Sequence, residues 1–153
     1  MDTRNCSWMK TQVIGKEAFG EVHMAIPRPL NADYSKSLVP IIVVKSAEFK
    51  HLSSLQKEES IMFILNDCPG IARCHGEDIS VEGNKKVYNL LLEFAFGSSP
   101  RNLMQRRSEG KLPESDVRRY TRVILKALRH MHERGFAYCD IKPENILVFF
   151  VQK

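Results

Sequence analysis

The most informative stretch of the sequence is Tyr138-Cys139-Asp140-Ile141-Lys142-Pro143-Glu144-Asn145. It places an acid, Asp140, a cation, Lys142, and an amide, Asn145, in one short loop between a long amphipathic segment and an apolar run. Phosphoryl transfer needs three such groups: an oxygen that accepts a proton, a cation beside the moving charge, and an oxygen ligand for magnesium. The stretch taken alone is equally compatible with a polar turn between a helix and a strand, because short motifs recur by chance.

The composition is that of a single globular domain. The chain has 153 residues, of which 43% are hydrophobic, so it can bury a core. The formal net charge of +5 favours phosphate or an acidic partner, but is also usual for a solvated surface. Much of this charge falls in residues 101–107 and 118–129, which we expect to be helical. They form no basic stripe interleaved with aromatics, so we expect no nucleic-acid binding.

The cysteines and the apolar runs indicate in which cellular compartment the protein is expected. No C-x-x-C pair and no metal-binding spacing occurs among the four cysteines, which are Cys6, Cys68, Cys74 and Cys139. The sequence opens without a secretory signal peptide, and no apolar run is long enough to span a bilayer. We therefore expect an intracellular protein, cytoplasmic or nuclear, with reduced thiols and no membrane insertion.

A glycine-containing hairpin is expected after a loose N-terminus at residues 1–7. Residues 8–25 read as strand, tight turn and strand, a form that lets backbone N–H groups approach phosphate oxygens. Three residues fit the phosphate-binding pattern G-x-G-x-x-G-x-V: Gly15, Gly20 and Val22. Glu17 replaces the middle glycine, and its carboxylate would face phosphates unfavourably unless it points outward. An ordinary hairpin is the alternative.

A buried strand follows a loop over residues 27–40. Residues 41–45 are β-branched and apolar up to Lys45, so a lysine ends a buried strand and needs an acceptor. Ile41, Val43 and Lys45 share one face, since side chains alternate along a strand.

The next segment can supply the acceptor. Residues 52–66 read as a helix with an inward stripe of Leu55, Met62 and Leu65. Glu58 falls on this stripe, whereas Glu59 is rotated by roughly 100°, towards solvent. An acid on an apolar stripe is costly unless paired, so we expect an ion pair between Lys45 and Glu58. The alternative is a Glu58 side chain that reaches out to water.

Two more strands and a break come next. We expect strands at residues 71–76 and 87–94, with the turn at 80–86. The second strand is almost entirely apolar, which predicts a central position in the sheet. Gly97-Ser98-Ser99-Pro100 indicates a hinge between two lobes, followed by a short helix over 102–107.

The longest helix is expected from Leu112 to about Arg134. Acidic residues suit its first turn and Gly135 can end it. Its buried stripe would consist of Val117, Tyr120, Ile124, Leu128 and Met131. His130 and His132 flank this stripe, and a surface role fits them better than a metal or a catalytic pairing with Cys139.

The order of these features resembles the eukaryotic protein kinase domain. That family has the same features in the same order: a glycine-rich hairpin, a strand with a lysine, a helix with a glutamate, a hinge, a long helix and a loop like Asp140–Asn145. The resemblance implies an α+β, protein-kinase-like fold with a five-stranded antiparallel N-lobe sheet and one helix, followed by the hinge, first helices and catalytic loop of the C-lobe. Residues 8–95 would form the N-lobe and 96–153 the start of the C-lobe.

A subgroup resemblance points to the plant mitogen-activated protein kinase kinase kinases. Four stretches carry it: Ser7-Trp8 before Val13-Ile14-Gly15, Glu77-Asp78-Ile79-Ser80-Val81-Glu82-Gly83, Tyr120-Thr121-Arg122 leading to Leu128-Arg129-His130, and Cys139-Asp140-Ile141-Lys142. This resemblance implies a serine/threonine kinase that uses ATP and Mg²⁺ on a protein substrate, with a MAP kinase kinase as a candidate.

The resemblance also implies a role for each matching residue. Lys45 would hold the α- and β-phosphates and Glu58 would orient Lys45, while Asp140 would act as base, Lys142 as cation and Asn145 as metal ligand. The nucleotide would be covered by Ile14, Gly15, Gly20 and Val22. The adenine would meet Val43, Leu92 as gatekeeper, and the backbone of Glu93 and Ala95.

The sequence departs from the family pattern in several places. Val43 stands where alanine is usual, Tyr138 replaces histidine and Cys139 replaces arginine. No Asp-Phe-Gly follows Asn145 before Lys153, so we expect a truncated domain that is inactive alone, with a strand over 147–151 left without its hairpin partner. The alternative function is a non-catalytic ATP- or partner-binding fragment with a regulatory role.

Overall fold

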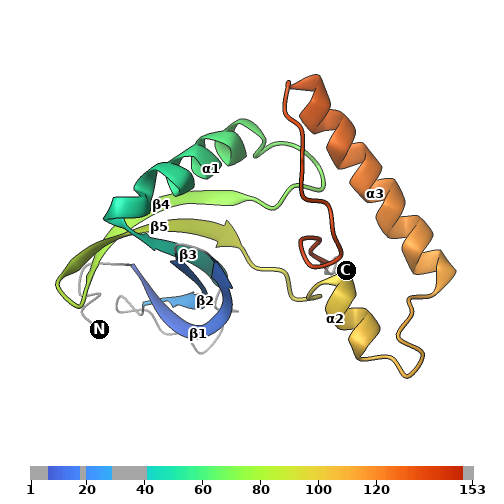
Figure 1. Cartoon of the computed structure of the whole chain (residues 1–153), viewed down its shortest axis with the longest axis horizontal. Coiled ribbons are helices and arrows are strands. Elements are labelled where there is room, and N and C mark those ends of the chain that lie inside the picture. The colour runs from blue at the N-terminus through green and yellow to red at the C-terminus, as the bar shows by residue number, and fades with distance from the viewer. Residues whose placement is uncertain (1–6, 18–19, 29–40, 150–153) are drawn as a thin grey trace. The chain divides into compact units, whose positions relative to one another are not determined.

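The computed structural model describes residues 7–17, 20–28 and 41–149 (Figure 1). The chain forms two compact units. The first unit consists of the chain up to Ile64 together with Arg73–Phe94, and the second of Leu65–Ala72 together with the chain from Ala95 onward. Parts of the predicted 27–40 loop and of the 147–151 strand lie outside the described residues.

The first unit is built on a five-stranded antiparallel sheet, as the sequence predicted. Its strand order is β1-β2-β3-β5-β4, so β5 is paired on both edges, in agreement with its apolar sequence. The strands are β1 (Trp8–Glu17), β2 (Gly20–Pro27), β3 (Ile42–Glu48), β4 (Cys74–Glu82) and β5 (Lys85–Glu93).

The turn between β4 and β5 is tighter than predicted. Glu82 pairs with Lys85, so only Gly83 and Asn84 form the turn, with φ of 55° and 65°. Positive φ at both central residues characterises the two-residue turn whose twist matches that of the flanking strands. The prediction of a turn over residues 80–86 was wrong because Ser80, Val81 and Glu82 continue the ladder of β4.

The sheet curls until its first and last strands meet. The indole Nε1 of Trp8 donates to Asp78 Oδ2 at 2.9 Å, and Lys10 Nζ donates to Glu82 Oε1 at 2.6 Å. Figure 1 shows β1 as a strongly bent ribbon, and two register shifts within β1 account for the bend. Trp8 is 2% exposed and packs with Ala25 and Val44 in the core.

A chain of hydrogen bonds joins the strands inside this curl. Ser46 on β3 donates to Asn89 on β5, which is fully buried, at 2.7 Å. Asn89 donates to Ser80 on β4 at 2.9 Å, and Ser80 donates to Glu82 at 2.8 Å, where the Lys10 ammonium also binds. Each of these buried polar groups therefore has a partner, which removes most of the cost of burying it.

Helix α1 (Leu52–Ile64) follows a short 3₁₀ turn, η2 (Phe49–His51), and begins where the sequence predicted. It ends two residues earlier than expected, and Leu65 lies beyond its end. Leu55 is 4% exposed and packs on Ala47 of β3 and Tyr88 of β5, which fixes the phase of the helix on the sheet.

Glu59 was predicted to face solvent, and this was wrong. Tyr88 is 1% exposed and its hydroxyl donates to Glu59 Oε2 at 2.6 Å. A buried phenol needs an acceptor, and Glu59 supplies it from the neighbouring position on α1. Burial, followed by the hydrogen bond to Glu59, raises the pKa of Tyr88 well above its usual value, so the phenol stays protonated.

The second unit contains the two helices that the sequence predicted. In α2 (Pro100–Gln105), Ser99 caps the N-terminus by accepting from the Asn102 N–H at 3.3 Å. Helix α3 (Glu114–Glu133) is followed by Gly135, whose φ of 79° permits the Phe136 N–H to reach the Met131 carbonyl at 3.0 Å.

The predicted inward stripe of α3 is only partly covered. Met131 is 6% exposed, whereas Val117 is 46% exposed, so the prediction for Val117 was wrong. The segment Leu65–Ala72 packs on the C-terminal part of α3, where Gly70 lies against Ala127, and Arg134 pairs with Asp67 at 3.1 Å. The N-terminal part of the stripe lacks such a cover among the described residues.

Residues 147–149 do not form the predicted strand. The Gly97 N–H donates to the Val148 carbonyl and the Val148 N–H donates to Ser98, both at 2.9 Å. A Cβ on Gly97 would stand 2.2 Å from the Val148 carbonyl oxygen, so this approach requires glycine. The segment is held by these two backbone hydrogen bonds to Gly97 and Ser98. A β-strand needs a longer series of such bonds, so no strand forms here. No described helix has the length and apolar content to cross a membrane.

His23 on β2 offers a test of the curled sheet. It is 7% exposed, and its Nδ1 has no hydrogen-bond partner among the described residues. Burial and the nearby Lys10 charge lower its pKa below 6.5, outweighing the carboxylates of Glu21 and Glu82. The folded protein therefore holds His23 neutral where the unfolded chain would already bind a proton.

We predict that the free energy of unfolding falls as the pH drops below 6.5, by up to about 1.4 kcal/mol per pH unit from His23. The sign follows because the unfolded state binds more protons in this window; the lowered pKa of Glu82 adds a loss only below 4.5. Denaturant unfolding at pH 7 and 5.5 can be followed by the fluorescence of Trp8, the single tryptophan. His23→Gln should flatten this dependence, and an equal slope in both proteins would contradict the prediction.

Candidate active site

Lys45 lies in the middle of the first unit. It stands on β3, opposite Val22 on β2 and Leu90 on β5, so the sheet fixes its backbone from both sides. Its side chain is 15% exposed, and its Nζ lies 2.6 Å from Glu58 Oε2 and 2.8 Å from Glu17 Oε2. A partly buried ammonium ion is thus held between two carboxylates.

The predicted ion pair between Lys45 and Glu58 is present. Glu58 lies three residues after Leu55 on α1, about one turn, so the burial of Leu55 turns the carboxylate towards β3. Burial is the largest influence on the pKa of Lys45 and lowers it, but the hydrogen bonds to Glu17 and Glu58 together outweigh burial. The net pKa is raised, so Lys45 stays charged at neutral pH.

The second carboxylate on Lys45 was missed by the sequence analysis, which expected Glu17 to face phosphate or point outward. Strand register explains the contact. Glu17 pairs with Gly20, and Gly20 pairs with Ala47, two residues from Lys45 on the same face of β3. No local pattern contains this contact. It follows only when the two strands of the hairpin are aligned with β3, which brings a carboxylate at the hairpin end beside a lysine that needs an acceptor.

A cavity of about 250 Å³ surrounds this cluster in the first unit. Its lining consists of Glu17, Gly20, Lys45, Ser46, Ala47, His51, Ser54, Leu55 and Glu58. It therefore combines one ammonium and two carboxylates with several small side chains, so the cavity is polar and charged. A Cβ on Gly20 would lie 1.8 Å from the Ser46 carbonyl oxygen, so glycine is required there by the packing of β2 on β3.

The structure also places the residues predicted to cover the nucleotide. Gly15 pairs with Val22 across β1 and β2, while Ile14 is 46% exposed on β1. Val43 and Leu92 stand opposite each other on β3 and β5. None of these five positions lines the cavity of Lys45. Of the residues predicted to cover the nucleotide, the described lining of this cavity includes Gly20.

Glu93 and Ala95 fall in different units. The Glu93 N–H donates to the Arg73 carbonyl at 2.9 Å, and its carboxylate accepts from the Arg73 N–H at 3.2 Å. Any contact of the Glu93 backbone with adenine would therefore have to use its carbonyl oxygen. The role predicted for these two residues stays a prediction.

The second unit carries the loop from Asp140 to Asn145. Lys142 Nζ donates to Asp140 Oδ2 at 2.7 Å, and Asn145 Nδ2 donates to the same oxygen at 2.8 Å and to the Asp140 carbonyl at 3.0 Å. The Asn145 N–H closes the turn on the Lys142 carbonyl at 3.0 Å. The three residues that the sequence singled out thus form one connected group.

This group keeps Asp140 ionised. The hydrogen bond from Lys142, with a further one from Asn145, lowers the pKa of Asp140, and the same contact raises the pKa of Lys142. The carboxylate is exposed, so it can accept a proton from a hydroxyl that approaches through solvent. The carboxylate and the Asn145 amide oxygen are also the kind of ligands that Mg²⁺ takes, so the donor set fits that ion.

Contacts within the second unit hold the loop at its end. Arg101 on α2 pairs with Glu144 at 2.6 Å, and Val148 is bonded to Gly97 and Ser98. The arginine pair is exposed and contributes at most about 1 kcal/mol. Cys139 is exposed, with its Sγ 3.8 Å from the Ala137 carbonyl, so no cation stands directly before Asp140.

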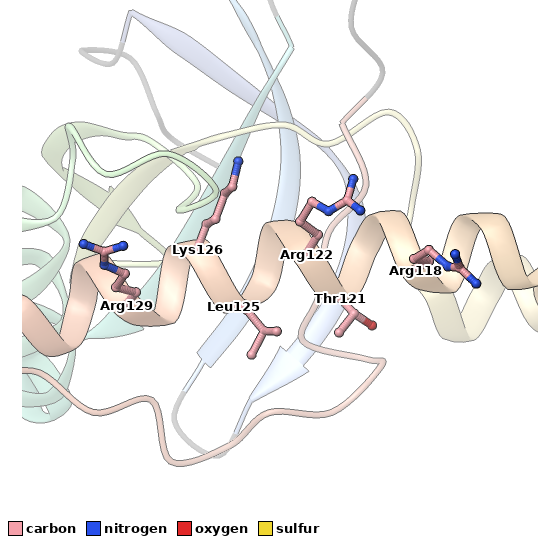
Figure 2. A pocket seen from close by; sticks show the side chains of 6 residues that line it. All are labelled: Arg118, Thr121, Arg122, Leu125, Lys126 and Arg129. Atoms are coloured by element: carbon pink, nitrogen blue, oxygen red, sulfur yellow. The ribbon is translucent and has the colours of Figure 1, made fainter.

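The histidines and the basic residues of α3 do not add to this site. Among the described residues, no three His, Cys, Asp or Glu side chains are placed to hold a metal. His130 is half-buried and His132 is exposed. A depression of about 540 Å³ lies along α3 (Figure 2). It is lined by Arg118, Thr121, Arg122, Leu125, Lys126 and Arg129, all from this one helix.

Comparison with known proteins matches residues 8–152 to the family described as protein kinase domain. The chain is 42% identical over 142 residues to mitogen-activated protein kinase kinase kinase 20 of Arabidopsis thaliana, covering 93% of this chain and 40% of that protein. It is 36% identical to kinase kinase kinase ANP1 of the same plant, covering 93% of this chain and 21% of that protein. The chain is 32% identical to the MAP kinase kinase kinase SSK2 of Saccharomyces cerevisiae, covering 94% of this chain and 8% of that protein.

The chain therefore spans less than half the length of these relatives. The family match covers both units, including the strand that carries Lys45 and the loop that carries Asp140. The five-stranded antiparallel sheet with its single helix is the fold expected for the first part of such a domain. From the paired lysine, the catalytic-type loop and the family match together, the chain belongs to the protein kinase domain family.

Proposed function

We propose that the chain provides the ATP-binding and proton-accepting residues of a serine/threonine protein kinase of the MAP kinase kinase kinase type. The observation that carries the proposal is the Lys45 ammonium, charged, partly buried and oriented by Glu58 at 2.6 Å. A cation held in this way is the form in which kinases bind the α- and β-phosphates of ATP.

Each residue has a distinct task in this proposal. Lys45 binds the phosphates, and Glu58 keeps the Lys45 side chain in one orientation. Asp140 accepts the proton of the substrate hydroxyl, Lys142 offsets negative charge near it, and Asn145 contributes an oxygen to the metal. Mg²⁺, when bound with ATP, supplies positive charge at the phosphates. Because phosphoryl transfer depends mainly on position and charge, these few residues carry most of the chemistry that the chain itself can supply.

The subgroup and the substrate rest on the similarity to relatives. Three relatives are named MAP kinase kinase kinases, two from a plant and one from yeast, and their matches extend over 93–94% of the chain. We therefore propose a serine or threonine hydroxyl of a protein as the acceptor, with a MAP kinase kinase as the candidate, inside the cell.

A second candidate function is a non-catalytic ATP- or partner-binding role. The contact between Glu17 and Lys45 at 2.8 Å favours it, because a carboxylate already occupies the cation that phosphates would need. The two candidates differ in whether bound ATP is ever consumed, so they are separated by binding and transfer measurements made on the same protein.

Mg-ATP binding should depend on Lys45. Lys45→Met removes the cation but keeps an unbranched side chain, and we expect the dissociation constant to rise by at least about tenfold, or 1.4 kcal/mol. Isothermal titration calorimetry can measure this, with Lys50→Met as the matched control. Lys50 also lies in the first unit, but its side chain is 66% exposed and pairs only with Glu48 among the described residues. Equal binding by wild type and Lys45→Met would remove Lys45 from the site.

Phosphate transfer should depend on Asp140. In the protein that carries these residues, Asp140→Asn should lower phosphorylation of a generic acceptor protein by about 10²–10⁴-fold, the usual contribution of a positioned base. The amide keeps the shape of the side chain but cannot take the proton. Unchanged Mg-ATP affinity in the variant would show that the nucleotide site is intact. Equal transfer by both proteins would refute the assignment of Asp140 as the base, and ATP binding without any transfer would support the non-catalytic role.

A further inference from the structure

Glu17 makes a contact that the proposed reaction does not use. Lys45 is the common partner of two carboxylates, Glu58 at 2.6 Å and Glu17 at 2.8 Å. The site therefore holds one positive and two negative charges. We propose that Glu17 is an autoinhibitory carboxylate, which occupies the phosphate-binding side of Lys45 and must leave before an anionic nucleotide can bind. This inference rests on the proposed role of Lys45 as the cation that binds phosphate.

The charges around Lys45 determine whether the Glu17 carboxylate and a nucleotide phosphate can bind it together. An ammonium group has three N–H donors, and the two carboxylates take two of them, so a third contact remains possible in principle. A nucleotide phosphate that used this donor would stand within a few ångströms of the Glu17 carboxylate, and like charges at that separation repel strongly inside a partly desolvated cavity. With Glu17 withdrawn, the pair of Lys45 and Glu58 is neutral and can accept the phosphate charge.

Of the two carboxylates, Glu17 is the more exposed, since the Glu58 side chain is 36% exposed. The Glu17 side chain is 47% exposed and Glu17 is the last residue of β1, whereas Glu58 lies within α1, one turn beyond the buried Leu55. Solvent is therefore available to hydrate the Glu17 carboxylate after it leaves Lys45, which limits the free energy needed to release it.

Close packing on β3 constrains the position in β2 that pairs with Glu17. Gly20, its partner in the hairpin, packs so closely on β3 that a Cβ would stand 1.8 Å from the Ser46 carbonyl oxygen. Rotation of the Glu17 side chain alone would release Lys45 and requires no shift of β2 at Gly20. A substitution at Glu17 should accordingly change the charge at Lys45 without disturbing the sheet.

Nucleotide titrations of Glu17→Gln test this proposal, with Glu21→Gln as the matched control. Glu21 lies in the same hairpin and its removal changes the net charge equally, but its carboxylate faces Lys16 and His23, not Lys45. We expect Glu17→Gln to bind Mg-ATP roughly tenfold more tightly than wild type and Glu21→Gln to bind as wild type does. The gain should be smaller for ADP and absent for adenosine, because the repulsion acts on phosphate charge.

Several outcomes would overturn the proposal. Equal Mg-ATP affinity of Glu17→Gln and wild type would show that the carboxylate does not compete, and weaker binding would show that it assists. An equal gain for adenosine would show a change of pocket shape instead of charge. The two single variants, Glu17→Gln and Lys45→Met, together separate this inference from the proposed function. If Lys45→Met alone weakens binding but Glu17→Gln has no effect, only the inference fails; if Lys45→Met has no effect, the proposed function fails as well.

Discussion

The partly buried charge of Lys45 is the constraint on which the rest of the first unit depends. An ammonium ion with only 15% of its side chain exposed needs partners, and Glu58 on α1 provides one at 2.6 Å. That contact requires α1 to lie on the sheet in one rotation, which Leu55 fixes by packing on Ala47 and Tyr88. The same rotation brings Glu59 to the Tyr88 hydroxyl, so two adjacent acids each satisfy a different buried donor.

The curled sheet also contains a second buried lysine, which is likewise paired with a carboxylate. Lys10 is 6% exposed on its side chain, and Glu82 accepts from it across the first and last strands of the sheet. The hydrogen bonds through Ser80 and Asn89 continue this pairing to Ser46, next to Lys45 on β3. Pairing of buried charges and amides thus runs through the sheet, and it gives the strand that carries Lys45 a rigid base.

The sequence predicted the structure correctly where it depended on a single helical or strand periodicity, or on one charged group that needed a partner. The spacing of Glu58 from Leu55 predicted the ion pair with Lys45, and the resemblance to the protein kinase domain implied the five-stranded sheet. The prediction failed where a residue's contacts depended on a partner far away in the sequence. Glu59 follows the helix phase away from Lys45, but Tyr88, far along the chain, needed an acceptor there. Residues 147–149 were predicted as a strand from their apolar character, yet their backbone bonds go to a loop. Likewise, the contact of Glu17 with Lys45 follows from strand register, which no local pattern contains.

The central claim is that Lys45 is a charged group, held by carboxylates, that binds nucleotide phosphate. The most direct measurement is the ¹H–¹⁵N NMR signal of the Lys45 side-chain ammonium, assigned with a Lys45→Arg variant and recorded with and without Mg-ATP. Because Lys45 is shielded and its pKa is raised, the account predicts a signal that persists at neutral pH and shifts on addition of Mg-ATP. A Lys45 signal that stays unchanged at saturating Mg-ATP, while the nucleotide is shown to bind, would contradict the account.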